Sequence, residues 1–443
     1  MALQAGFAHV DITPPVGVHK IGWIIDLEGK RVLDPLFARV AILGRARTRL
    51  AVVALDTLSV RWRLVQELRG RIEAAWGFPG DAIMVVATHN HAGPAVTSLG
   101  KVAVAEAYVA EMLGKVVTAF GQALQGCVPA EIGFGHCFEW RVAHNRRVRM
   151  RDGTTKTHGG FRDLTSLCYE GPIDPEVGVI ALRRASDHAP LGCLVNFACH
   201  PTHHGGGNDF SGGYPAALCA ELQAGGWPEA LFLNGACGNV HDADPARGGQ
   251  GLPPAEIARL LAGDVQACTA GIAYVEDLPL ARRTRHISLE FRDLSDAEIR
   301  GAVPGAQRFN TNEVYDSLIT NLVAKIRREG RQHAELQAFF LGDVALAAVP
   351  AEYFVEYGLD IKERTWPRRT LVVSCANGMV GYLPTREAFA RGGYETTFYD
   401  GTCLAHNAGD RLTRAVIRLV NGHKPAPPAD AGPAPQNAAE SSE

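Results

Sequence analysis

Two histidines follow an apolar run in the stretch VVATHNHAGPAV, residues 85–96. The run Ile83–Ala87 is typical of a buried strand, and His89 and His91 come after it at spacing i, i+2. Side chains at that spacing in an extended segment point to the same face. Imidazole is the commonest metal ligand in proteins and also serves as a general acid or base. Taken alone, the pair is compatible with metal binding, with catalysis or with two ordinary polar residues entering a turn.

A second histidine group repeats this arrangement in LVNFACHPTHHGGGNDFSGGY. An apolar strand ends at His200, and His203, His204 and three glycines follow. A strand end holds an imidazole rigidly, as a metal ligand requires. Together with His89, we interpret His200 as a ligand. At least one of His203 and His204 is expected to be an ordinary exposed loop residue.

Three further strand ends carry groups that could serve such a site, because open α/β sheets bind ligands at the carboxyl ends of their strands. VALAAVPAEYF presents Glu352, which could also be a plain charge at a helix start. VVSCANGMVGYLP presents Tyr382, whose alternative role is simple packing. VVALDTLSV presents Asp56, which could orient a histidine or cap a turn.

The elements that must position these residues alternate between short β-branched runs and helical patterns, which predicts an α/β fold. Gly342-Asp343 joins two strands as a hairpin, so the sheet should be mixed. No internal repeat is detectable. The predicted strands are Arg39–Leu43, Leu50–Leu55, Ile83–Ala87, Val177–Leu182, Leu191–Ala198, Ala230–Leu233, Glu335–Leu341, Val344–Val349 and Leu371–Ser374. The predicted helices are Trp62–Ala75, Ala103–Leu124, Pro215–Ala224, Pro254–Ala270, Val314–Arg328, Glu352–Arg364 and Ala405–Val420.

Composition limits the partners that the chain is expected to have. A net charge of −3 over 443 residues gives no general attraction to nucleic acid or to anionic membranes. No apolar run reaches about 18 residues and no signal-like segment opens the chain, so we expect no stable membrane association and a cytoplasmic location. The ten cysteines form no CxxC pair and are expected to be reduced. Residues 424–443, rich in Pro and Ala, are expected to be a disordered tail.

These motifs together resemble the neutral/alkaline non-lysosomal ceramidase family, in its zinc-binding catalytic domain, over nearly all of residues 5–421. THNHAGPA resembles the family's Thr-His-Thr-His-Ser-Gly-Pro, and NFACHPT its Asn-Trp-Phe-Ala-X-His-Pro. VPAEYF resembles Val-Pro-Gly-Glu-Phe. NGMVGYLPTREAFARGGYE resembles Asn-X-Tyr-X-X-Tyr-X-Thr-Thr followed by Tyr-Glu, with the same separation between its two tyrosines. Four motifs in the same order, each at a strand end, are strong evidence for the resemblance.

The resemblance implies a single ceramidase-like domain, residues 1–423, with two mixed β-sheets flanked by helices. It implies one zinc ion, with His91 beside the metal polarising the scissile carbonyl. It also implies substrate contacts from Arg146 and Tyr394, although Arg147 is adjacent and competes for the first role. The zinc ligands it implies are His89, His200, Glu352 and Tyr382.

One motif departs from the family. Ceramidases carry Gly-Asp-Val-Ser-Pro, whereas this chain reads Gly238-Asn239-Val240-His241-Asp242, with His241 at the serine position. His241 is expected to be an acid/base or a substrate contact, with an ordinary loop histidine as the alternative. We therefore predict a zinc hydrolase that cleaves an amide of a small or medium substrate other than ceramide. A zinc esterase, lactonase or glycan-directed hydrolase is the first alternative, and a non-catalytic binding protein is the second.

Overall fold

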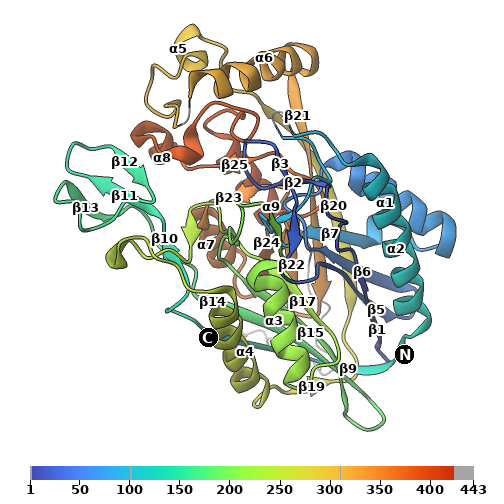
Figure 1. Ribbon diagram of the computed structural model, residues 1–443. Helices are drawn as coiled ribbons and strands as arrows, with labels where there is room; N and C mark the ends of the chain where they lie inside the picture. Colours follow the sequence, from blue (N-terminus) through green and yellow to red (C-terminus); the bar gives the residue numbers. More distant parts are fainter. Residues whose placement is uncertain (1, 100–101, 310, 424–443) are drawn as a thin grey trace, which may run out of the picture.

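The largest sheet holds the strands that precede both histidine groups. The computed structural model describes residues 2–99, 102–309 and 311–423 (Figure 1). Nine strands follow the order β17-β15-β14-β9-β1-β5-β6-β7, with β19 paired to β9. The pairs at the two ends, β15–β17 and β6–β7, are parallel, and the others are antiparallel. The strands are β1 (Gln4–Asp11), β5 (Phe37–Arg45), β6 (Thr48–Leu55), β7 (Ile83–Ala87), β9 (Val128–Phe138), β14 (Glu176–Arg184), β15 (Pro190–Phe197), β17 (Ala230–Asn234) and β19 (Tyr274–Val275).

A second sheet of four strands follows the order β20-β21-β22-β24. Its last pair, β22–β24, is parallel and the others are antiparallel. The predicted hairpin joins β21 to β22, and its turn residue Gly342 has a positive φ of 60°. The strands are β20 (Leu280–Glu290), β21 (Arg331–Leu341), β22 (Val344–Ala348) and β24 (Arg369–Val373).

Within the described residues, one succession of elements occurs three times. Three antiparallel strands are followed by a helix, by a fourth strand parallel to the third, and by a second helix. A parallel pair needs a crossover connection, and the helix supplies it. Unit 1 (residues 4–125) is β1-β5-β6-α1-β7-α2, unit 2 (128–269) is β9-β14-β15-α3-β17-α4, and unit 3 (280–421) is β20-β21-β22-α7-β24-α9. The six helices are α1 (Trp62–Trp76), α2 (Glu106–Gln125), α3 (Gly213–Ala224), α4 (Pro254–Thr269), α7 (Val355–Arg364) and α9 (Ala408–Asn421).

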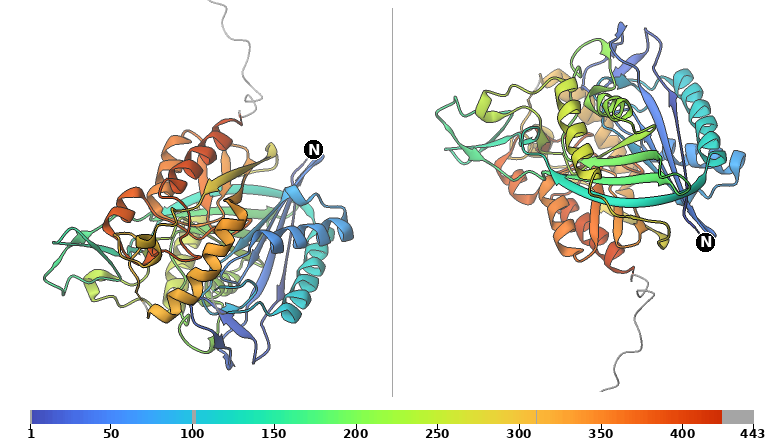
Figure 2. Two further views of the ribbon diagram at one scale, coloured as in Figure 1. Left: turned by 90° about the horizontal axis from the view of Figure 1, so that it is seen from above. Right: turned by 90° about the horizontal axis from the view of Figure 1, so that it is seen from below.

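The two sheets pack face to face, and helices cover their outer faces. Val52, Leu194 and Leu233 of the larger sheet share one buried cluster with Phe339 and Leu346 of the smaller sheet. In both views of Figure 2 helices α1 and α2 of unit 1, blue to teal, lie apart from the red helix α9 of unit 3. No helix among the described residues is long and apolar enough to cross a bilayer.

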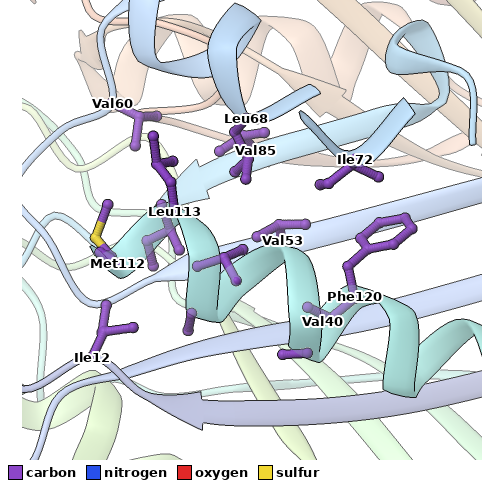
Figure 3. Packing of buried hydrophobic residues seen from close by; sticks show 14 of the residues in the cluster. Ile12, Val40, Val53, Val60, Leu68, Ile72, Val85, Met112, Leu113 and Phe120 are labelled. Carbon is purple, nitrogen blue, oxygen red and sulfur yellow. The ribbon is translucent and has the colours of Figure 1, made fainter. Parts of the chain in front are cut away.

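A helix-on-sheet core fixes the strand that carries His89. In Figure 3, Leu68 and Ile72 of α1 lie near Val85 of β7. Phe120 of α2 lies near Val40 of β5 in the same cluster. All five side chains are almost completely buried. Truncating such a side chain costs about 2–5 kcal/mol, so the position of β7 is strongly determined.

Small sheets and short helices complete the described structure. Several of the two-stranded sheets lie at the ends of the long strands, where the polar residues gather. The small sheets pair β2 (His19–Ile21) with β3 (Leu27–Glu28) and β8 (Gly93–Pro94); β4 (Arg31–Val32) with β16 (Asp209–Phe210); β10 (His144–Asn145) with β18 (Val240–His241); β11 (Arg147–Met150) with β12 (Thr155–Thr157) and β13 (Ser166–Tyr169); and β23 (Glu352–Tyr353) with β25 (Tyr382–Leu383). The short or peripheral helices are α5 (Asp296–Ile299), α6 (Asn312–Glu329), α8 (Arg386–Arg391) and the 3₁₀ turns Gly80–Ala82, Pro245–Arg247 and Tyr394–Thr396.

The mixed α/β class is confirmed, and each predicted strand and helix overlaps an element of its type. The description as two sheets is too coarse, because five small sheets also occur among the described residues. The predicted helix start at Glu352 is wrong: Glu352 belongs to β23, and α7 begins at Val355. The single-domain boundary at 423 stays a prediction, and the expected tail, 424–443, lies outside the described residues.

Candidate metal centre and its cavity

Three histidine side chains converge at the ends of β7 and β15. The Nε2 atoms of His89 and His200 are 3.0 Å apart, and Nε2 of His91 is 3.3 Å from the first and 3.0 Å from the second. His89 has a φ of 67°, a conformation that non-glycine residues rarely adopt and that costs about 1–3 kcal/mol. Such strain clusters at functional sites, because surrounding structure must hold it in place.

The other ring nitrogen of each histidine faces a backbone carbonyl. Nδ1 lies 2.8 Å from the Leu58 oxygen in His89 and 2.7 Å from the Gly22 oxygen in His91. In His200 it lies 3.2 Å from the Cys237 oxygen. A carbonyl only accepts, so each Nδ1 carries the proton and donates it. With Nδ1 committed in this way, the three Nε2 atoms are the ones left to face a shared ligand, and a cation between them would satisfy all three.

Burial keeps the His91 and His200 rings neutral. Removal from water, followed by repulsion from His89, lowers the pKa of His91 to about 3. Burial and the nearby Arg146 guanidinium also lower the pKa of His200 well below its ordinary value. Neutral imidazole is the form that binds metals. The close approach of three Nε2 atoms without a shared proton is what an ion-binding site requires.

Unit 3 adds a carboxylate and a phenol to the three histidines. Glu352 and Tyr382 are direct partners in the parallel pair β23–β25. Oε2 of Glu352 lies 3.2 Å from Nε2 of His89 and 3.7 Å from that of His200. The Tyr382 ring stacks on the His200 ring at 6.3 Å between centroids, and its hydroxyl is within hydrogen-bonding reach of Glu352. Donors on a tetrahedral zinc ion at about 2.0–2.1 Å lie roughly 3.3 Å apart, so this donor set fits such an ion.

A buried network of Arg146, Arg147 and Glu395 holds the Tyr382 hydroxyl in place. Nη2 of Arg146 donates to the Tyr382 hydroxyl at 3.2 Å and to the Gly238 carbonyl at 2.7 Å. Nε of Arg146 donates to Glu395 at 2.8 Å, and Arg147 donates to the other oxygen of Glu395 at 2.6 Å. Burial alone would raise the pKa of Glu395, but the two guanidinium groups outweigh it and hold this pKa at about 2. Arg146 lines the cavity and Arg147 is not among the lining residues, so Arg146 stays the predicted substrate contact.

His241 lies beside the histidine group, joined to it by a bridge between the backbones of His200 and His241. The Ala243 N–H donates to Nδ1 of His241 at 2.8 Å, so the ring proton lies on Nε2. That Nε2–H donates to the Thr202 hydroxyl. Burial is the main cause that lowers the pKa of His241, which stays neutral. His158 packs edge-on against the His241 ring at 4.9 Å.

One cavity of about 720 Å³ is lined by the histidine group together with Arg146, His241, Glu352 and Tyr382. The half-buried Tyr394 lines it, with its hydroxyl 3.1 Å from that of Tyr399 and its ring edge-on to Tyr382 at 6.0 Å. Burial raises the pKa of Tyr394 to about 12, so its phenol keeps the proton. Trp23 and Phe309, both half-exposed, add apolar surface to the cavity lining. The cavity thus combines a polar histidine centre with an apolar part.

Every residue that the sequence placed in the site lines this cavity: His89, His91, Arg146, His200, His241, Glu352, Tyr382 and Tyr394. Of His203 and His204, at least one was expected to be an ordinary exposed loop residue; His204 is exposed, but it also lines the cavity. Asp56 as a histidine partner is wrong: it binds Arg39 at 2.8 Å and the Phe37 amide, and the Leu58 carbonyl orients His89 instead.

Sequence reasoning missed two kinds of functional residue. Thr202 and His158 contact His241, and only Thr202, two residues after His200, had a signal in its position. The carbonyls of Gly22, Leu58 and Cys237 had none, since any residue type supplies a carbonyl. At Gly22 the backbone itself is constrained: φ is 146°, and an added Cβ would lie 2.1 Å from the His91 oxygen.

Neither a protein-family model nor a curated protein matches the chain. Solved structures do match it. The neutral ceramidase from Pseudomonas aeruginosa has a TM-score of 0.73 at 17% identity, over 95% of this chain and 74% of that one. The chain has the neutral ceramidase fold. A structure of ceramidase complexed with C2 gives a TM-score of 0.69 at 16% identity, over 95% of this chain and 75% of the other.

The neutral ceramidase fold confirms, at the level of architecture, the resemblance that the four motifs indicated. Each motif of the sequence lies at the end of a third or fourth strand in one of the three units. His89 and His91 follow β7 of unit 1, His200 and His241 follow β15 and β17 of unit 2, and Glu352 and Tyr382 follow β22 and β24 of unit 3. The centre is therefore assembled from all three units.

Proposed function

We propose that this chain is a zinc-dependent hydrolase that cleaves an amide bond in a small or medium substrate other than ceramide. One observation carries the proposal: three imidazole Nε2 atoms and a carboxylate converge in a cavity of about 720 Å³. The likeness in fold to neutral ceramidases supports amide hydrolysis. Replacement of the family serine by His241 argues against ceramide.

The proposed zinc ligands are His89, His200, Glu352 and Tyr382. A zinc ion held there supplies Lewis acidity and makes hydroxide available near neutral pH. The carbonyls of Leu58 and Cys237 fix the two rings in the tautomer that binds metal. Arg146 holds the Tyr382 hydroxyl in place. Burial, followed by the Glu352 carboxylate, raises the pKa of this phenol well above its ordinary value, and the Arg146 charge offsets only part of that rise.

His91 could serve as a metal ligand or as a catalytic residue. The two roles require different protonation states of Nε2, because Nδ1–H is already donated to the Gly22 carbonyl. With Nδ1–H donated to that carbonyl, a neutral His91 presents only a lone pair and can act as a further metal ligand. To polarise the scissile carbonyl, as the family resemblance implies, the ring must carry a second proton on Nε2. We retain His91 as the catalytic residue of the proposal, and the metal content of a His91 variant tests the choice.

The Thr202–His241 pair offers the substrate a hydrogen-bond donor. His241 donates to the Thr202 hydroxyl, so the hydroxyl hydrogen of Thr202 is free to point elsewhere, and both residues line the cavity. Arg146 and Tyr394 are the proposed substrate contacts. This assignment makes His241 a functional substitute for the family serine rather than a loop residue.

Metal analysis of the purified protein tests the proposal. Plasma mass spectrometry of the wild type should give about one zinc per chain, and His89→Ala and Glu352→Ala should lose it while remaining folded. His204→Ala is the matched control, because this exposed histidine also lines the cavity but is not a proposed ligand. Metal-dependent turnover should then be sought with amides, followed by esters and lactones. A wild-type chain that stays metal-free after zinc is added would overturn the proposed mechanism.

A further inference from the structure

The cavity contains a second charged group that the proposed reaction does not use. Arg61 and Lys325 both line it and share one carboxylate, Asp400. Nη2 of Arg61 donates to Oδ2 of Asp400 at 2.6 Å, and Nζ of Lys325 lies 3.3 Å from Oδ1. We call Arg61, Lys325 and Asp400 the cationic wall. Arg61 lies at the start of α1, Lys325 lies in α6, and Asp400 lies in the turn before Gly401.

The charges of the cavity do not balance at this wall. Apart from histidines, the charged residues that line the cavity are Arg61, Arg146, Lys325, Glu352 and Asp400. Arg146 is neutralised by Glu395 behind it, and Glu352 belongs to the proposed metal site. Burial alone would raise the pKa of Asp400, but Arg61 and Lys325 outweigh it and lower this pKa, so Asp400 is ionised. Two cations against one anion leave one unit of positive charge at the wall.

The two cations also have hydrogen-bond donors to spare. Among the described residues, Asp400 is the recorded partner of both the Arg61 guanidinium and the Lys325 ammonium. Arg61 still has Nη1, and an ammonium has three donors of which one is used. Their side chains are 34% and 24% exposed, so the groups are reachable and only partly hydrated. Such a site favours an anion with several acceptor oxygens.

Two backbone connections link the cationic wall to the proposed metal centre. Leu58, whose carbonyl orients His89, is three residues before Arg61. Gly401, next to Asp400, accepts a hydrogen bond from the Tyr382 amide at 2.7 Å. Each unit has a third and a fourth strand. Proposed site residues follow five of these six strands, and β6 is the exception. The segment after β6 carries Arg61 to the same cavity.

We propose that the substrate carries an anionic group, such as a carboxylate, that binds Arg61 and Lys325 while the scissile amide lies at the metal. This inference rests on the proposed function, since it names the substrate class of the same cavity. The cavity lining also includes apolar residues such as Ile24 and Met379, which suit a hydrocarbon part of the substrate. The substrate is thus an anionic amide rather than a neutral lipid.

Matched pairs of metal-binding probes test the inference. Isothermal titration calorimetry on the zinc-loaded protein would compare ω-carboxyalkyl hydroxamates of increasing chain length with their methyl esters. The hydroxamate anchors each probe at the metal, and the two members differ only in the terminal charge. At the best length the free acid should bind about tenfold more tightly than the ester, as one new charge-assisted contact implies. Equal binding at every length would overturn the inference.

Three variants assign the preference to the wall. Arg61→Gln and Lys325→Met should each reduce the acid-to-ester preference to less than about threefold and leave ester binding unchanged. Asp400→Asn should increase the preference, because it removes the competing anion; a purely structural ion pair would change only the melting temperature. If Arg61→Gln fails to fold, Lys325→Met carries the test, and a preference that survives in it would contradict the proposal. Failure of acids and esters alike to bind would overturn the proposed metal site, and the inference with it.

Discussion

The metal centre and the cationic wall lie in one cavity but are built in different ways. At the centre, each imidazole has one nitrogen committed to a backbone carbonyl, and the three rings are 9% exposed or less. At the wall, Arg61 and Lys325 reach in on long side chains that are partly exposed and share a single carboxylate. The centre is preorganised by backbone, whereas the wall can adapt to what binds there. This difference is expected if the centre performs the reaction and the wall selects the substrate.

The largest expected effect is loss of the metal from the centre. His89→Ala removes a ligand whose ring is fixed by the Leu58 carbonyl, and no nearby side chain can replace it in the same geometry. Zinc content should fall from about one per chain to near zero, and turnover should fall to background. The same assays on Lys325→Met should show full zinc content, which would confirm that the two parts are separable.

His91→Ala sharpens the comparison within the centre. If His91 contacts the substrate, the variant should keep its zinc and lose about 100- to 1,000-fold in kcat, the effect of removing an electrostatic stabiliser. Mass spectrometry and steady-state kinetics on the same sample measure both quantities. Simultaneous loss of zinc would assign His91 to the ligand set instead.

Glu395→Gln tests the ion network behind Tyr382. Glu395 is completely buried between Arg146 and Arg147, and its loss leaves buried positive charge unpaired. The free energy of unfolding should fall by about 3–5 kcal/mol, measured by denaturant titration. Thr157→Val, which removes one neutral donor to the same carboxylate, should cost about 1 kcal/mol or a little more. A cost for Glu395→Gln no larger than that of Thr157→Val would show that the network is not what holds this side of the cavity.

The same carboxylate predicts a pH dependence of stability. Its pKa of about 2 in the folded chain lies below the ordinary value of 4.5, so its contribution is complete above about pH 5. That contribution is lost as the pH falls through 4.5 towards 2. Between about pH 6 and pH 3 the wild type should lose about 2 kcal/mol of unfolding free energy more than Glu395→Gln. Parallel acid dependence in the two proteins would contradict this assignment.

The smallest expected effect belongs to the wall. Lys325→Met breaks an ion pair that is about a quarter exposed on one side and a fifth on the other. Pairs of this kind contribute about 0–1 kcal/mol, so the midpoint of chemical unfolding should hardly move. A cost above about 2 kcal/mol would mean that the wall, like the centre, is structural.

The sequence predicted the strand ends well and their supports poorly. Buried β-branched runs such as Ile83–Ala87 identified β7 to the residue, and the polar groups after them located the site. Strand β20 was missed because its middle is exposed on both faces and carries Arg283, Arg285 and His286, which hides the apolar pattern. The cationic wall combines residues from α1, α6 and a distant turn, so no local spacing could reveal it. The threefold repetition of units is a property of strand pairing and leaves no sequence period.

Distribution of the proposed metal centre over three units would link metal uptake to folding. No single unit, and no pair of units, holds the histidines, the carboxylate and the phenol together. A chain split between units 2 and 3 should therefore bind zinc only when its two fragments reassociate, which makes metal affinity a reporter of assembly. By the same linkage, free zinc at about 1,000 times its dissociation constant would add about 4 kcal/mol to the stability of the assembled chain. The supply of metal would then influence how long the folded protein persists.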